Sequence, residues 1–204
     1  MQWRYYDSLV TDSQRRWSYN EVVTKALHLA VAVGIAVTTI AALRASDKTI
    51  HPVSFPSAHT HAVAPDGRFA VVNVDSDKEP YHALFLEDRQ TNSWRKVLEY
   101  DRSVEVLWNP DSSAFAVNNY AGSNVGECLI LFTKGKTAPV NVGDALLDRM
   151  ASGEELSTLH ISDHIYWTAV RWTSPGLLKV KVWGHTGVNP VRDFQYFHAY
   201  KIQR

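Results

Sequence analysis

A turn motif followed by an alternating apolar run occurs twice in this chain. The first copy is APDGRFAVVNVDSD, residues 64–77, and the second is NPDSSAFAVNNYAGSN, residues 109–124. Their prolines, Pro65 and Pro110, stand 45 positions apart. Pro-Asp-Gly and Pro-Asp-Ser favour tight turns, and apolar residues at alternate positions favour strands with one buried face. The chain is therefore expected to fold as repeated antiparallel units of short strands.

Short runs rich in Val, Ile, Phe, Tyr and Trp continue this pattern along the chain. Laid on the repeat, they predict one unit of four strands over residues 61–100 and a second over residues 104–142. A third, weaker copy covers residues 166–202. Four antiparallel strands in about 40–45 residues are typical of one propeller blade.

The third copy places Trp172 and Pro175 where Trp108 and Pro110 stand in the second. It is displaced because the segment 143–156, GDALLDRMASGEEL, intervenes. Apolar residues three to four positions apart in this segment predict one short helix inserted among the strands.

The stretch APDGRFAVVNVDSDKEPYHALFLEDRQTNSWRKV, residues 64–97, resembles the repeat of TolB-type (WD40-like) β-propellers. The resemblance covers residues 58–142 and, more loosely, residues 165–202. It implies propeller-like blades and a bacterial cell envelope as the setting. It implies no particular function, because propellers serve as binding modules, hydrolases and scaffolds alike.

Three units are too few for an ordinary propeller ring, and each needs neighbours to cover its faces. The fold class predicted is mainly β: antiparallel propeller-like blades or a compact β-sandwich, with one short helical insertion over an exposed face. The alternative is that a second copy of the chain completes the structure.

An uncharged run of 18 residues, ALHLAVAVGIAVTTIAAL, occupies positions 26–43. It is close to the shortest length that crosses a bilayer as a helix, and we expect a single transmembrane anchor there. A cleaved signal peptide or a buried helix is the alternative. Arg15, Arg16 and Lys25 precede the run, so the positive-inside tendency places the N-terminus in the cytoplasm.

The predicted organisation is a cytoplasmic tail over residues 1–25, the anchor over 26–43, a linker over 44–57 and a β-domain over 58–204. This domain would be extracytoplasmic, and periplasmic if the source is bacterial. Lys+Arg and Asp+Glu balance at 21 each, so the chain has no net field to attract nucleic acid. The single cysteine, Cys128, alternates with apolar neighbours and is expected in the core.

Nine histidines raise the question of a metal site. His59 and His61 would share one face of a strand. HISDH places His160 and His164 four positions apart and differs from an inverted zinc-protease motif by Asp163 in place of Glu. The strand pattern that follows removes the helix that this motif needs. We therefore expect no metal and no cofactor, and keep a metal-dependent hydrolase on His160, Asp163 and His164 as the alternative.

The remaining candidates are polar and aromatic residues in or beside turns. Trp183 borders the Gly-containing loop of GHTGVNPVRDF and is the best surface anchor. With His185, Tyr120 and Asn124 it forms the predicted binding set.

The function predicted is non-catalytic binding of another protein, with an immunity-type protein or inhibitor that occludes a toxin or hydrolase as one specialisation. A structural subunit of an envelope complex is a further alternative.

Overall fold

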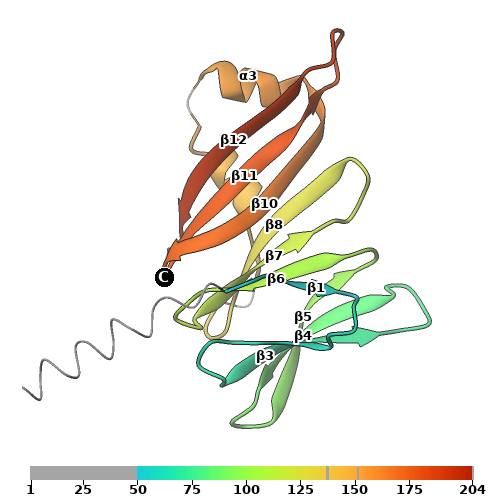
Figure 1. Cartoon of the computed structure of the whole chain (residues 1–204), viewed down its shortest axis with the longest axis vertical. Coiled ribbons are helices and arrows are strands. Elements are labelled where there is room, and N and C mark those ends of the chain that lie inside the picture. Colours follow the sequence, from blue (N-terminus) through green and yellow to red (C-terminus); the bar gives the residue numbers. More distant parts are fainter. Residues whose placement is uncertain (1–49, 137, 151, 204) are drawn as a thin grey trace, which may run out of the picture. The chain divides into compact units, whose positions relative to one another are not determined.

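The structure, a computed structural model, describes residues 50–136, 138–150 and 152–203. They are mainly β, as predicted, and their strands form two sheets (Figure 1). The smaller sheet has the order β2-β3-β4-β5. The larger has the order β1-β6-β7-β8-β10-β11-β12, with β9 paired to β8. Neither sheet closes into a barrel over the described residues.

The smaller sheet is the first predicted unit. Each of its strands pairs antiparallel with the next along the chain. The Pro-Asp-Gly turn connects the first two strands, and Gly67 has a φ of 71°, which favours glycine. The strands are β2 His61–Val63, β3 Phe69–Asp75, β4 His82–Asp88 and β5 Ser93–Tyr100.

The second predicted unit is also a four-stranded antiparallel meander. Ser112 occupies the place of Gly67 in its turn and has a positive φ of 59°. The strands are β6 Val104–Trp108, β7 Ala114–Asn119, β8 Val125–Phe132 and β9 Val140–Asn141.

One further strand, β1 (Val53–Phe55), pairs antiparallel with β6. It lies within the predicted linker 44–57, so that segment is not all linker. Phe55 is fully buried, and this burial stabilises β1.

The third unit has three strands, β10 Ser162–Ser174, β11 Leu177–Thr186 and β12 Asp193–Lys201. They form an antiparallel meander. Ile165 and Tyr166 of β10 also pair in parallel with Val125 and Gly126 of β8. The third unit therefore continues the sheet of the second.

The helical insertion contains two helices, α2 (Val142–Leu147) and α3 (Glu154–His160), where one was predicted over residues 143–156. The Asn141 side chain caps α2 by accepting hydrogen bonds from the N–H groups of Gly143 and Asp144. Gly153 precedes α3 in an extended conformation, which separates the two helices.

Two apolar clusters form the core. One lies between the two sheets, and its fully buried members include Phe55, Leu84 and Phe115. The other contains Val142, Leu146 and Leu159 of the helices together with buried residues of β10–β12. The helices therefore cover one face of the third unit, and Cys128 lies in this second cluster, fully buried as predicted.

Two buried tryptophans connect successive units by equivalent hydrogen bonds. The indole N–H of Trp108 donates to the carbonyl of Ala62 at 2.8 Å. The indole N–H of Trp172 donates to the carbonyl of Leu107, the residue before Trp108, at 3.0 Å. Each unit is thus held to the preceding one through the same position of the repeat.

Asn118 of β7 makes a second connection between units. Its side-chain oxygen accepts from the N–H of Ala169 in β10 at 2.6 Å, and its side-chain nitrogen donates to the carbonyl of Ala169 at 3.1 Å. Asn118 is 2% exposed. A buried backbone group without a partner costs free energy, so this side chain replaces the strand partner that Ala169 lacks on that side.

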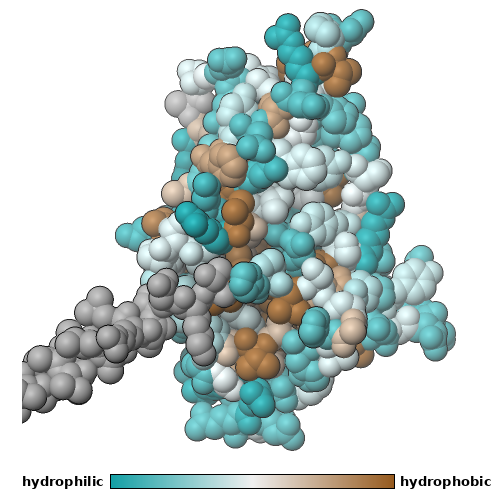
Figure 2. Space-filling view, in the orientation of Figure 1, coloured by the Kyte–Doolittle hydropathy of each residue, from teal (hydrophilic) through white to brown (hydrophobic). Residues whose placement is uncertain are grey.

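The space-filling view shows one face of the molecule, on which hydrophobic residues form small separate patches among hydrophilic ones (Figure 2). Over the part of the chain that is described, no helix is both long and apolar enough for a membrane span. The predicted tail 1–25 and anchor 26–43 lie outside the described residues.

The indole bond of the third unit gives a test of the fold. Trp172→Phe keeps an aromatic ring but leaves the Leu107 carbonyl without its donor. We expect the free energy of unfolding to fall by about 2 kcal/mol, measured by urea unfolding of the full chain. Trp94→Phe, at a position that is 49% exposed, should change it by less than about 0.5 kcal/mol. Equal losses in the two variants would contradict this packing.

Candidate functional site

One face of the third unit is not covered by the helices. Along β11, residues 178, 180, 182, 184 and 186 are buried, and the residues between them are at least partly exposed. Directly opposite residues of neighbouring strands share a face. The register therefore defines what we call the open face, whose members include His164, Tyr166, Thr168, Lys179, Lys181, Trp183, His185, Asp193, Gln195 and Phe197.

Aromatic rings and cations are interleaved on the open face. The rings of Tyr166 and Trp183 stack with centroids 4.4 Å apart. The ammonium group of Lys181 lies 4.8 Å from the Trp183 ring centroid, and that of Lys179 lies 4.3 Å from the centroid of Phe197. Contacts of this kind are attractive because the face of an aromatic ring carries partial negative charge.

Trp183 is held in place by its neighbours. Its indole N–H donates to the hydroxyl of Thr168 at 3.2 Å, and Tyr166, on which it stacks, donates its own hydroxyl to the carbonyl of Ser123. Trp183 is nevertheless 37% exposed. A cleft of about 470 Å³ borders it, lined by residues that include Tyr166, Lys181, Trp183, His185, Asp193 and Gln195.

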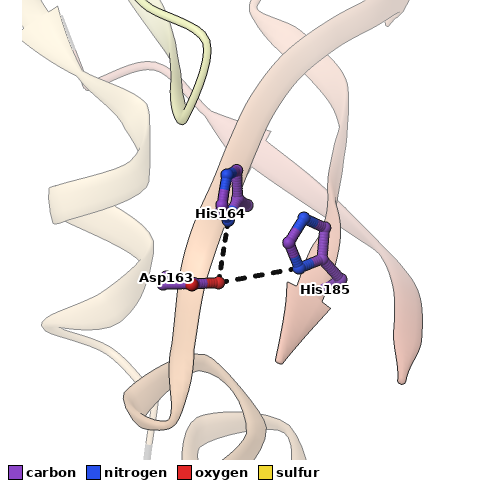
Figure 3. A group of neighbouring side chains, drawn as sticks. All are labelled: Asp163, His164 and His185. Carbon is purple, nitrogen blue, oxygen red and sulfur yellow. Dashed lines mark hydrogen bonds and ion pairs between the residues drawn. The ribbon is translucent and has the colours of Figure 1, made fainter. Parts of the chain in front are cut away.

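At one end of the open face, Asp163, His164 and His185 come together (Figure 3). Nδ1 of His164 lies 2.8 Å from Oδ1 of Asp163, and Nδ1 of His185 lies 3.6 Å from the same oxygen. The two imidazole rings stack with centroids 4.0 Å apart. Asp163 and His164 come from β10, and His185 comes from the opposite position of β11.

A bulge explains why two consecutive residues of β10 reach the same site. On a regular strand Asp163 and His164 would point to opposite faces. The register of β10 on β11 shifts between Ser162 and His164, however, and a β-bulge of this kind redirects a side chain. The Asp163 carboxylate therefore lies beside both imidazoles.

Two glycines leave room for this arrangement. A Cβ atom at Gly184 would stand 1.8 Å from the carbonyl oxygen of His164, and one at Gly187 would stand 3.1 Å from Cγ of Asp163. Real Cβ atoms do not approach backbone to 1.8 Å, so β10 and β11 can lie this close at His164 only because residue 184 has no side chain.

The chemistry of the cluster is that of a proton acceptor or a cation ligand. The hydrogen bond to His164 holds the pKa of Asp163 below its usual value, so the carboxylate is ionised at neutral pH. Two imidazoles and one carboxylate are also ligands that a transition metal accepts. His160, at the end of α3, is not among the three residues.

The structure brings together two of the four residues of the predicted binding set. Trp183 and His185 are both on the open face. Asn124 follows Ser123, the acceptor of the Tyr166 hydroxyl, and lines a second cleft of about 270 Å³ together with Asp163. Tyr120 donates its hydroxyl to Glu105, and burial and this bond raise its pKa.

The histidine pairs named from the sequence do not form the cluster. His59 and His61 are exposed and are not part of it, and His164 is joined by His185 instead of His160. The sequence analysis named Asp163 and His164 together with His160, and named His185 only in the binding set, so it missed the association of His185 with the other two. The turn between Ser174 and Leu177 predicts that β10 and β11 form a hairpin, but it does not predict which of their residues lie opposite one another.

No protein-family model, no curated protein and no solved structure matches the chain significantly. The resemblance to TolB-type repeats accordingly stays a prediction.

Gly184→Ala tests the close approach of β10 and β11. Because the new Cβ would overlap the His164 carbonyl, the strands must separate, and we expect the free energy of unfolding to fall by about 3 kcal/mol in chemical denaturation of the full chain. Gly122→Ala is the matched control, since its Cβ would meet nothing nearer than the Asn124 nitrogen at 3.9 Å. If the Gly184→Ala protein is as stable as the Gly122→Ala protein, β10 and β11 do not lie as close at residue 184 as described.

Proposed function

We propose that this chain is a membrane-anchored binding protein that holds another protein on its open face, without catalysis. The observation that carries the proposal is the exposed, preorganised row of aromatic and cationic side chains on β10, β11 and β12. Trp183 and Phe197 are 37% and 49% exposed, yet each lies beside a lysine that shares the same face.

The aromatic residues of this face and Arg171 suit protein recognition. Aromatic residues and Arg are enriched at protein interfaces, and a few such anchors contribute most of the binding energy. The indole of Trp183 is restrained by Thr168 and Tyr166, so it loses little conformational freedom on binding. Such restraint favours a role as the central anchor.

The charges indicate the chemistry of the partner. Arg171, Lys179 and Lys181 lie along neighbouring positions of β10 and β11, with Arg171 opposite Lys179. A partner surface with carboxylates around an apolar centre complements this row, and opposite charges steer association. Asp193, at the other end of the face, opposes His185 and offers an acceptor to the same partner.

The anchor and the topology are part of the proposal. The uncharged run 26–43 would insert the chain in a membrane with residues 1–25 in the cytoplasm, and the β-domain would face the extracytoplasmic side. In a bacterium that side is the periplasm. An immunity-type protein or inhibitor, and a structural subunit of an envelope complex, both fit such a placement.

We also propose that the units derive from TolB-type blades. The equivalent indole bonds of Trp108 and Trp172, and the positive φ angles of Gly67 and Ser112 at one turn position, support successive copies of one unit. The parallel pairing of β10 with β8 departs from separate blades.

A metal-dependent hydrolase on His160 and His164 has less support. His160 ends α3, whereas His164 belongs to β10, so the helix that the zinc-protease motif needs does not continue through both.

Photo-crosslinking in native cells tests the binding face directly. The full chain, carrying a photoreactive phenylalanine at position 183 or 197, should give the same discrete adduct from both positions. Lys181→Glu, introduced beside the probe at 197, should reduce the yield at least tenfold, because it reverses a charge next to the anchor.

Controls come from the smaller sheet. The same probe at Trp94, which is 49% exposed, should give no such adduct, and Lys78→Glu should leave the yield from 197 unchanged. Adducts of equal yield from 94, or none from 183 and 197, would refute the proposal.

A further inference from the structure

We propose that Asp163, His164 and His185 bind one Zn²⁺ ion at the end of the open face. This inference is independent of the binding of a protein partner. It rests on the geometry of the three side chains, which offer one ligand atom each within 4.8 Å of one another.

An imidazole nitrogen without a hydrogen-bond partner points to a missing ligand. Nδ1 of His185 is buried and accepts or donates no hydrogen bond. Its nearest carboxylate oxygen, Oδ1 of Asp163, is 3.6 Å away, which is too far for a hydrogen bond. Buried polar atoms are rarely left unpaired in folded proteins. A cation coordinated by His185 Nδ1 would give this nitrogen the partner that it lacks.

The separations of Asp163 Oδ1 from the two imidazole nitrogens lie near those around a tetrahedral ion. Zn–N bonds of about 2.0–2.1 Å at tetrahedral angles place ligand atoms about 3.3 Å apart. The separation of 3.6 Å between His185 Nδ1 and Asp163 Oδ1 is close to this value. His164 Nδ1, now 2.8 Å from the same oxygen, has to move away by about 0.5 Å, to the spacing of a tetrahedral site.

The ligand types select the kind of ion. Two imidazoles and one carboxylate suit Zn²⁺ and its first-row neighbours, whereas Mg²⁺ and Ca²⁺ prefer oxygen ligands alone. Three protein ligands leave a fourth position for water. Of the three ligands, His185 also lines the cleft beside Trp183. An ion here would also join β10 to β11 where Gly184 lets them approach.

The test uses the full chain without a histidine tag, stripped of metal and titrated with ZnCl₂ in a calorimeter. We expect one equivalent to bind with a dissociation constant below about 10 µM, and His185→Ala or Asp163→Asn to weaken binding at least tenfold. His160→Ala is the matched control, because it removes a neighbouring imidazole outside the cluster. It should bind as the unsubstituted chain does.

A second measurement needs no variant. X-ray absorption of the zinc-loaded unsubstituted chain should show two imidazoles and oxygen ligands at about 2.0 Å. The proposal is overturned if no saturable binding is seen at zinc concentrations up to 100-fold above the expected dissociation constant. A coordination shell with fewer or more than two imidazoles would also overturn it. So would a loss of zinc affinity in His160→Ala equal to that in His185→Ala.

Discussion

The hydrogen bonds between the Asn118 side chain and the backbone of Ala169 are the constraint on which the third unit depends. Strand β10 pairs with β8 only at Ile165 and Tyr166, so its buried backbone needs another partner at Ala169. One amide supplies both a donor and an acceptor there. Because Asn118 belongs to β7, the third unit is fixed on the second at a defined position, and the indole bond of Trp172 fixes it again.

The open face follows from this attachment. With the buried side of β10 and β11 held against the helices and β7, their alternate side chains can only face outward. The bulges of β10 then decide which residues are neighbours. They place His164 opposite His185 and Tyr166 opposite Trp183, so that a carboxylate and two imidazoles lie next to a stacked aromatic pair.

Local sequence signals predicted much of this fold. The Pro-Asp turns and alternating apolar runs predicted the first two units. The repeat also predicted that Trp172 is equivalent to Trp108, and the indoles of both make equivalent hydrogen bonds. Strand β1 lies inside the expected linker 44–57; it is only three residues long, too short for a periodic pattern, and its Phe55 is fully buried. The parallel pairing of β10 with β8 is a long-range contact, and no local pattern encodes it.

The bulges of β10 are the reason that the sequence does not predict the candidate cluster. If β10 and β11 paired without bulges from the Ser174–Leu177 pair onward, Tyr166 would lie opposite His185. The two register shifts near Ala169 and Trp172 change that partner to His164, two positions away. A third register shift, between Ser162 and His164, brings Asp163 to the same site. A bulge interrupts the regular alternation of a strand, and periodicity alone does not reveal it.

Disulfide trapping measures this register directly. Opposed strand residues have Cα atoms about 4.5–5.5 Å apart, within the range of a disulfide, whereas diagonal neighbours lie about 7–8 Å apart. Cysteines replacing His164 and His185 in the full chain should therefore crosslink on mild oxidation, while cysteines replacing Tyr166 and His185 should not. The buried Cys128 should remain a free thiol in both variants. Crosslinking of the 166–185 pair without the 164–185 pair would contradict the register and, with it, the open face.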